Sequence, residues 1–141
     1  MTILTLLEAD QNAEGAIGFA NQHQLKPIAV YVLDSGGNAL VLKRQENATF
    51  LRVDIAKAKA WTAISLAVPS RDFASMAETR PHFVNSLVSI SQGRMTPAAG
   101  GVLIYRENEI VGAVGVSGDT PDNDEEAAKV GAIAAKLSTG P

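Results

Sequence analysis

Cysteine is absent from the 141-residue chain. Its absence excludes disulfide bonds, thiolate metal sites and a thiol nucleophile. Histidine is nearly absent too: only His23 and His82 occur, and their separation matches no recognised spacing of metal ligands. We therefore expect no intrinsic metal site.

Long hydrophobic runs are also missing. No stretch approaches the length of a membrane span, and residues 1–8 combine a short apolar stretch with no basic residue, unlike a signal peptide. We therefore expect no membrane partner and a cytoplasmic location.

An excess of positive charge is lacking as well. The 12 Lys and Arg residues are outnumbered by 15 Asp and Glu residues, which gives a formal charge of −3. The basic residues between positions 43 and 59 cluster only loosely, without the density of a groove for a polyanion. We expect no nucleic-acid partner, and no Ser-His-Asp order, acid pair or phosphate loop stands out.

The chain does contain enough apolar material for one core. Hydrophobic residues make up 46% of it, and 141 residues is an ordinary size for one domain. We expect a single domain over residues 1–141.

Helix signals recur at both ends and in the middle of the chain. Thr5 and Glu8 fit a capping box that opens a helix to about Gln22. Ser70 is placed to cap a short helix, and Thr120 followed by proline is a cap-plus-first-turn signal. We expect the further helices at Arg52–Leu66, Ser70–Met76, Pro81–Val88 and Thr120–Leu137.

Strand signals come in two pairs. The segments 28–33 and 39–42 flank a glycine-containing turn, and 102–105 and 110–116 flank a turn in which Asn108 can adopt the left-handed conformation. Helices and hairpins do not alternate as βαβ units. The order predicts an α+β fold, in which helices pack on an antiparallel sheet built from two hairpins.

Two glycines stand inside the last predicted strand. Each glycine, Gly112 and Gly115, lacks the side-chain packing that an alanine would provide in a strand. We therefore expect another part of the protein or a ligand to approach the strand backbone closely. A tightly packed helix is one explanation, and a ligand or neighbouring subunit is the other. A dinucleotide fingerprint is rejected because these glycines do not lie between a strand and its helix.

Several motifs taken together resemble one known family. They are Val32-Leu33-Asp34-Ser35-Gly36-Gly37, Arg44-Gln45-Glu46-Asn47-Ala48, Lys57-Ala58, Gly112-Ala113-Val114-Gly115-Val116-Ser117-Gly118 and Asp124-Glu125. In this order they are similar to the GlcG/HbpS family, which also includes the C-terminal domain of PduO-type proteins. The resemblance covers roughly residues 5–137, which we take as the core of the domain.

The resemblance implies a profilin-like fold, a homo-oligomer, and a small ligand that in some members is haem, which is bound or degraded. Two departures bear on the ligand. Glu46 stands where the family commonly has Asp, and no proline follows Gly100-Gly101.

Three charged residues form the main candidate ligand site. Arg44 and Glu46, at i and i+2 beyond a strand, would point to one side, and Lys57 could join them from the next helix. Arg44 and Lys57 would hold a carboxylate, such as a haem propionate, while Glu46 orients the arginine. The alternative is a surface salt bridge of about 0–1 kcal/mol.

Three further residues complete the candidate set. Thr96 could offer a hydroxyl from a glycine-rich loop, although a turn role is simpler, and Gly115 could admit a ligand. His82, beside apolar neighbours, is the candidate axial ligand for haem, against a half-buried histidine bonded to backbone. His23 is expected to be solvated at a helix end.

Three functions remain open from the sequence. The first is a small-ligand-binding protein that binds or degrades haem. The second is an enzyme acting on a small carboxylate-bearing metabolite, with Arg44 and Lys57 as anion binders and Glu46 or His82 as acid/base. The third is a structural or regulatory oligomer without a ligand.

Overall fold

The computed structural model describes residues 3–140. Its elements follow one another as α1 (Leu6–Gln22), β1 (Ala29–Asp34), β2 (Ala39–Arg44), α2 (Leu51–Leu66), α3 (Ser70–Thr79), α4 (Pro81–Ile90), β3 (Gly101–Arg106), β4 (Glu109–Ser117) and α5 (Pro121–Ala134). This arrangement confirms the predicted α+β class and both hairpins.

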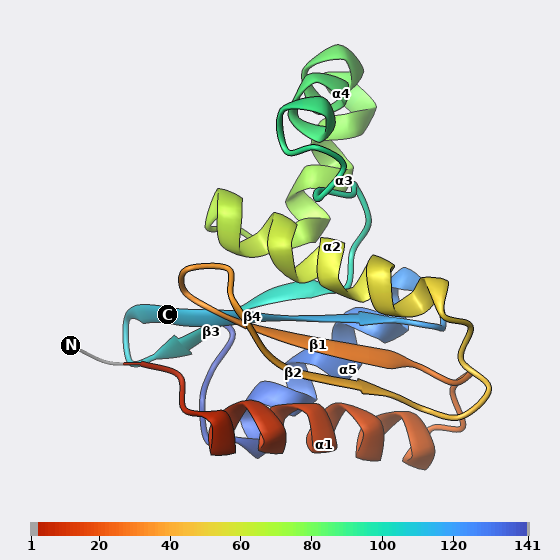
Figure 1. The fold of residues 1–141 in the computed structure, drawn as a ribbon, viewed down its shortest axis with the longest axis vertical. Helices are drawn as coiled ribbons and strands as arrows, with labels where there is room; N and C mark the ends of the chain where they lie inside the picture. The colour runs from red at the N-terminus through yellow and green to blue at the C-terminus, as the bar shows by residue number, and fades with distance from the viewer. Residues whose placement is uncertain (1–2, 141) are drawn as a thin grey trace.

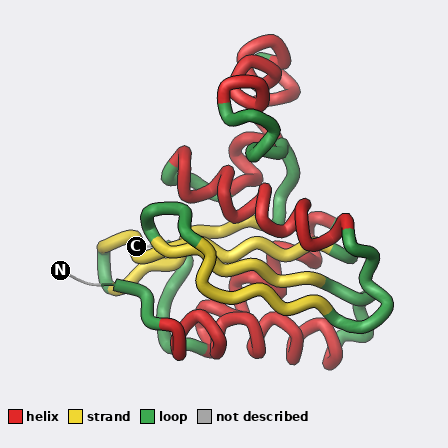
Figure 2. Tube along the Cα trace, in the orientation of Figure 1, coloured by secondary structure: helices red, strands yellow, loops and turns green. Residues whose placement is uncertain are grey.

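The four strands form one sheet in the order β2-β1-β4-β3, with every neighbouring pair antiparallel. Figure 1 shows α2 across one face of the sheet, and α1 with α5 on the opposite face. The helices α3 and α4 extend beyond α2, away from the sheet, and we call them the α3–α4 arm. Figure 2 shows the same layers, with strands between helices.

Helix starts follow the sequence signals closely. The Thr5 hydroxyl accepts a hydrogen bond from the Glu8 backbone N–H, and the Glu8 carboxylate accepts one from the Thr5 N–H, so the capping box is present. Thr120 caps α5 through the N–H of Asn123. The end of α5 was predicted too late, because the helix stops at Ala134.

Two turn details differ from the predictions. Ser70 does not cap α3, because its buried hydroxyl donates to the Ala98 carbonyl and accepts from the Gly101 N–H. In the β3–β4 turn, Glu107 rather than Asn108 takes the left-handed conformation, with φ 57°.

The hydrophobic core is divided by the sheet. On the α1/α5 face the buried side chains are mostly alanines from the helices, packed on valines and isoleucines from the strands. On the α2 face the buried set is Leu33, Ala60, Ala63, Leu103 and Ala113. A third cluster of Phe73, Val84 and Met95 holds the α3–α4 arm against α2 through Trp61 and Leu66.

The close approach predicted at the strand glycines is present, with different neighbours at each. A Cβ atom on Gly115 would lie 2.0 Å from the Ala56 carbonyl oxygen, so α2 lies directly on that strand. A Cβ atom on Gly112 would meet the Leu33 carbonyl oxygen at 2.3 Å and the Leu4 side chain at 2.9 Å. Gly112 therefore faces the neighbouring strand and the N-terminal segment.

Within residues 3–140, no helix has both the length and the apolar character needed to cross a membrane. The cytoplasmic location stays a prediction.

Candidate functional site

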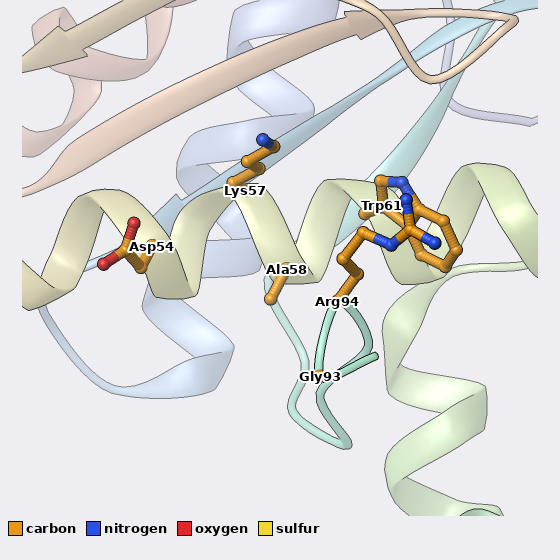
Figure 3. Close-up of a pocket in the computed structure, with 6 residues that line it drawn as sticks. All are labelled: Asp54, Lys57, Ala58, Trp61, Gly93 and Arg94. Atoms are coloured by element: carbon orange, nitrogen blue, oxygen red, sulfur yellow. The ribbon is translucent and has the colours of Figure 1, made fainter. Parts of the chain in front are cut away.

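A pocket of about 230 Å³ opens between α2 and the loop that follows α4. We call it the Trp61 pocket, and its lining residues are shown in Figure 3: Asp54, Lys57, Ala58, Trp61, Gly93 and Arg94.

The floor of the Trp61 pocket is one face of α2. Four lining residues of α2 are spaced three or four positions apart, which places them side by side on the helix surface: Asp54, Lys57, Ala58 and Trp61. Ala58 leaves room between the larger side chains. The pocket is therefore a consequence of helical periodicity combined with one small residue.

The opposite wall is the 91–95 loop, whose backbone is held by hydrogen bonds. Gln92 and Gly93 both have positive φ, 58° and 79°, which turns the chain sharply after α4. The Gly93 N–H donates to the Val88 carbonyl at 2.8 Å. The buried hydroxyl of Ser91 accepts from the Met95 N–H at 3.2 Å. The loop thus presents Arg94 from a fixed backbone.

The loop is also anchored to α2. Met95 is buried in the cluster that includes Phe73. The Thr62 hydroxyl accepts from the Thr96 N–H at 3.0 Å and donates to the Ala58 carbonyl at 2.8 Å. The two walls of the pocket are therefore tied together next to the site.

Two cations border the pocket from different walls. The Arg94 guanidinium lies 4.8 Å from the centre of the Trp61 ring, and the Lys57 ammonium lies 5.7 Å from the centre of the Tyr31 ring. Among residues 3–140, neither cation forms an ion pair with a carboxylate. With Asp54 as the single acid in the lining, the pocket carries a formal charge of +1.

In the structure, the three residues predicted to form one site make separate contacts: Arg44, Glu46 and Lys57. Arg44 donates from Nη1 to the Ala48 carbonyl at 2.8 Å and the Gln45 carbonyl at 3.2 Å, so it braces the loop between β2 and α2. Glu46 is exposed in that loop. Neither residue lines the Trp61 pocket, whose lining includes Lys57 and Arg94.

The other predicted residues lie at separate places. Thr96 follows the 91–95 loop, and its backbone N–H donates to the Thr62 hydroxyl. Gly115 is covered by α2. His82 is exposed at the start of α4, on the α3–α4 arm. His23 is exposed, and its ring stacks on Phe19 with ring centres 4.1 Å apart. Its Nδ1 lies within hydrogen-bond distance of the Phe19 carbonyl oxygen.

The sequence reasoning missed Lys59, which is the buried lysine of α2. Its ammonium donates to Asp124 Oδ2 and to the Val116 carbonyl, both at 3.0 Å, with side chains 4% and 2% exposed for Lys59 and Asp124. Burial lowers the pKa of Lys59, the Asp124 charge opposes this, and the nearby Arg52 charge adds to the lowering. The pair joins α2, β4 and α5 behind the site.

A sequence signal for Lys59 existed. It lies three residues after Ala56 and four before Ala63, both of which are buried, so it falls on the apolar stripe of α2. Lys57, two residues earlier, points to a different side of the helix.

No group of three or more His, Cys, Asp or Glu side chains within the described part of the chain is arranged to hold a metal ion.

Comparison with protein families gives one match along most of the chain. Residues 4–133 match the family model described as haem degrading protein HbpS-like. A curated relative, the corrinoid adenosyltransferase PduO of Citrobacter freundii, is 26% identical over 136 residues. The match covers 96% of this chain and 40% of that protein, so the chain spans well under half of the relative's length.

Solved structures share the fold over nearly the whole chain. The crystal structure of a PduOC–haem complex superposes with a TM-score of 0.88 at 25% identity, covering 99% of this chain and 100% of that one. The crystal structure of HbpS superposes with a TM-score of 0.83 at 30% identity, covering 94% of this chain and 90% of that one.

Proposed function

Because this chain belongs to the HbpS-like family of haem-degrading proteins, we propose that it is a small-ligand-binding protein whose ligand is haem. The observation that carries the proposal is the match, over 99% of this chain, to the fold of a relative crystallised with haem. The absence of cysteine leaves histidine, tyrosine and methionine as the side chains able to ligate the iron.

His82 is the axial ligand in this proposal. Its ring is exposed, and within residues 3–140 it makes no hydrogen bond, so both ring nitrogens are accessible. Phe83 follows it and is 40% exposed, which supplies apolar surface at the same end of α4. His23 is the second candidate, because its Nδ1 faces the Phe19 carbonyl at 3.1 Å and, in the described part of the chain, its Nε2 stays free for the iron.

Titration with ferric haem, followed through the Soret band, tests the proposal. The wild-type protein should give a saturable band, His82→Ala should shift and weaken it, and His23→Ala should leave it unchanged. The histidine variants are matched, since both remove an exposed ring. Equal spectra for wild type and His82→Ala would exclude His82 as the ligand, and a wild-type signal that never saturates would reject haem as the specific ligand.

We also propose that the chain forms a homo-oligomer. Large apolar side chains are exposed next to one another in the chain, with Phe50 at 87% beside Leu51 at 55%, and Leu6 at 63% beside Leu7 at 67%. Clustered exposed apolar residues are typical of association surfaces. Light scattering at micromolar concentration should give a mass that is a multiple of 14.8 kDa, and a monomer mass would contradict the proposal.

A further inference from the structure

We infer that the Trp61 pocket is a binding site for a monoanionic carboxylate, held by Arg94 and assisted by Lys57. The inference rests on the proposed function only in that haem propionates are one source of such a group. A free small carboxylate is the other source.

Arg94 is prepared to bind a planar anion. Its Nε donates to the Ser91 carbonyl at 2.8 Å, and its guanidinium lies over the Trp61 ring, so the side chain is held from two directions. The two terminal nitrogens have no hydrogen-bond partner within residues 3–140. A guanidinium with a free edge suits bidentate contact with a carboxylate.

Lys57 and Asp54 set the charge that the pocket accepts. Lys57 adds a second cation from the helix floor, and Asp54 reduces the formal charge of the lining to +1. A monoanion neutralises this charge, whereas a phosphate dianion would leave excess negative charge beside Asp54. Figure 3 shows Asp54 and Arg94 at opposite ends of the lining, with Lys57 between them.

The rest of the lining favours an organic carboxylate over an inorganic anion. Trp61 and Ala58 offer apolar surface for the carbon skeleton of a ligand. The volume of about 230 Å³ lies below the range of about 300–1,000 Å³ usual for drug-sized ligands. The pocket therefore suits a small acid, or the carboxylate arm of a larger ligand whose body lies outside.

The single tryptophan of the chain makes this testable directly. Since Trp61 is the only tryptophan, tryptophan fluorescence reports on its surroundings, which are this pocket and a second hollow beside Gly36 and Gly37, and the Arg94 and Lys57 variants assign a change to this pocket. Benzoate and propionate should each give a saturable fluorescence change with wild type, and benzamide, which is neutral, should not. Arg94→Ala should weaken benzoate binding about tenfold or more, and Lys57→Ala should weaken it by a smaller factor.

A matched control exists on the α3–α4 arm. Arg80 lies 4.3 Å from the centre of the Phe83 ring, so it makes the same kind of cation–ring contact as Arg94 but lies outside the pocket. Arg80→Ala should bind benzoate as wild type does. Circular dichroism melts of all variants establish that each is folded.

The two carboxylate sources are separated by titrating haem and haem dimethyl ester. If propionates occupy the pocket, Arg94→Ala should weaken haem binding and leave the ester unaffected. If Arg94→Ala weakens benzoate but not haem, the carboxylate is a free metabolite and the inference stands. A lack of saturable response to benzoate and propionate, with Arg94→Ala binding haem as wild type does, would overturn the inference while the haem proposal survives. Carboxylate binding without any haem binding would reject the haem proposal instead.

Discussion

Gly101 and Gly115 are directly opposed across β3 and β4, and the backbone of α2 lies over both. A Cβ atom would lie 2.1 Å from the Lys59 carbonyl oxygen at Gly101, and 2.0 Å from the Ala56 carbonyl oxygen at Gly115. The glycine pair lets the helix approach the sheet without intervening side chains. This approach carries Lys59 to its partners on β4 and α5.

Gly115→Ala should destabilise the fold by about 1–3 kcal/mol, because the added methyl group meets helix backbone that has no room to move. Gly18→Ala is the control, since Gly18 lies in α1 and a Cβ atom there would have no neighbour within 4 Å. That change should stabilise by up to about 1 kcal/mol through helix propensity. Urea unfolding of both variants checks the prediction, and unchanged stability for Gly115→Ala would contradict the close contact.

Lys59→Met should destabilise the protein by about 3–5 kcal/mol, because it leaves the Asp124 carboxylate buried without its cation. Lys129→Met, which removes a 42%-exposed lysine from its ion pairs with Glu125 and Glu126, should cost less than about 1 kcal/mol. Urea unfolding measures both. The double variant Lys59→Met/Asp124→Asn should lose less than the sum of its single variants, and additive losses would show that the two groups are not coupled.

Ser70→Ala should destabilise by about 1–3 kcal/mol, because the Gly101 N–H and the Ala98 carbonyl would lose a buried partner. Ser86→Ala removes an exposed hydroxyl that donates to the Phe83 carbonyl and should change stability by less than about 0.5 kcal/mol. Thermal melts of the pair test this. Equal melting temperatures would mean that the Ser70 hydroxyl does not hold the loop before β3.

Glu8 should make stability depend on acid pH. Its hydrogen bond from Arg106, with those from Thr5, lowers its pKa from 4.5 to about 2. A carboxyl group with a lowered folded-state pKa contributes stability above its unfolded-state pKa of 4.5 and loses it as pH falls toward 2.

Glu8→Gln should therefore cost about 1–3 kcal/mol at pH 7 and less as the pH falls to 2. Glu126→Gln, at an exposed ion pair with Lys129, is the control and should show no such convergence. Urea unfolding between pH 2 and 7 measures the effect. A constant difference between Glu8→Gln and wild type over this range would contradict the assignment.

Much of the fold could be predicted because its boundaries are local. At two helix starts a threonine, Thr5 or Thr120, accepts a hydrogen bond from a free backbone N–H, and at a third Pro81 has no N–H to satisfy. These features need only neighbouring residues. The prediction that Ser70 caps α3 is wrong, because its hydroxyl can bond either to the start of its own helix or to a segment distant in sequence. The distant segment, rather than the start of α3, provides its partners.

The site could be predicted only in part, because its walls are far apart in sequence. Lys57 was identified and Trp61 follows four residues later on the same helix, but Arg94 reaches this helix only after the α3–α4 arm returns the chain to α2. The proposed convergence of Lys57 with Arg44 assumed that both residues faced one ligand, whereas Arg44 bonds to backbone carbonyls in its own loop. Long-range contacts of this kind leave no spacing signal.

The most direct test of haem binding is the amount of haem that stays with the protein after unbound haem is removed by gel filtration. Increasing haem should bring the retained haem, measured as the pyridine haemochrome, to a plateau at a fixed ratio of haem to chain. A haem-free protein of similar size and charge should retain none. Retained haem that rises in proportion to the amount added, or that is lost on the column as in the control, would contradict the account.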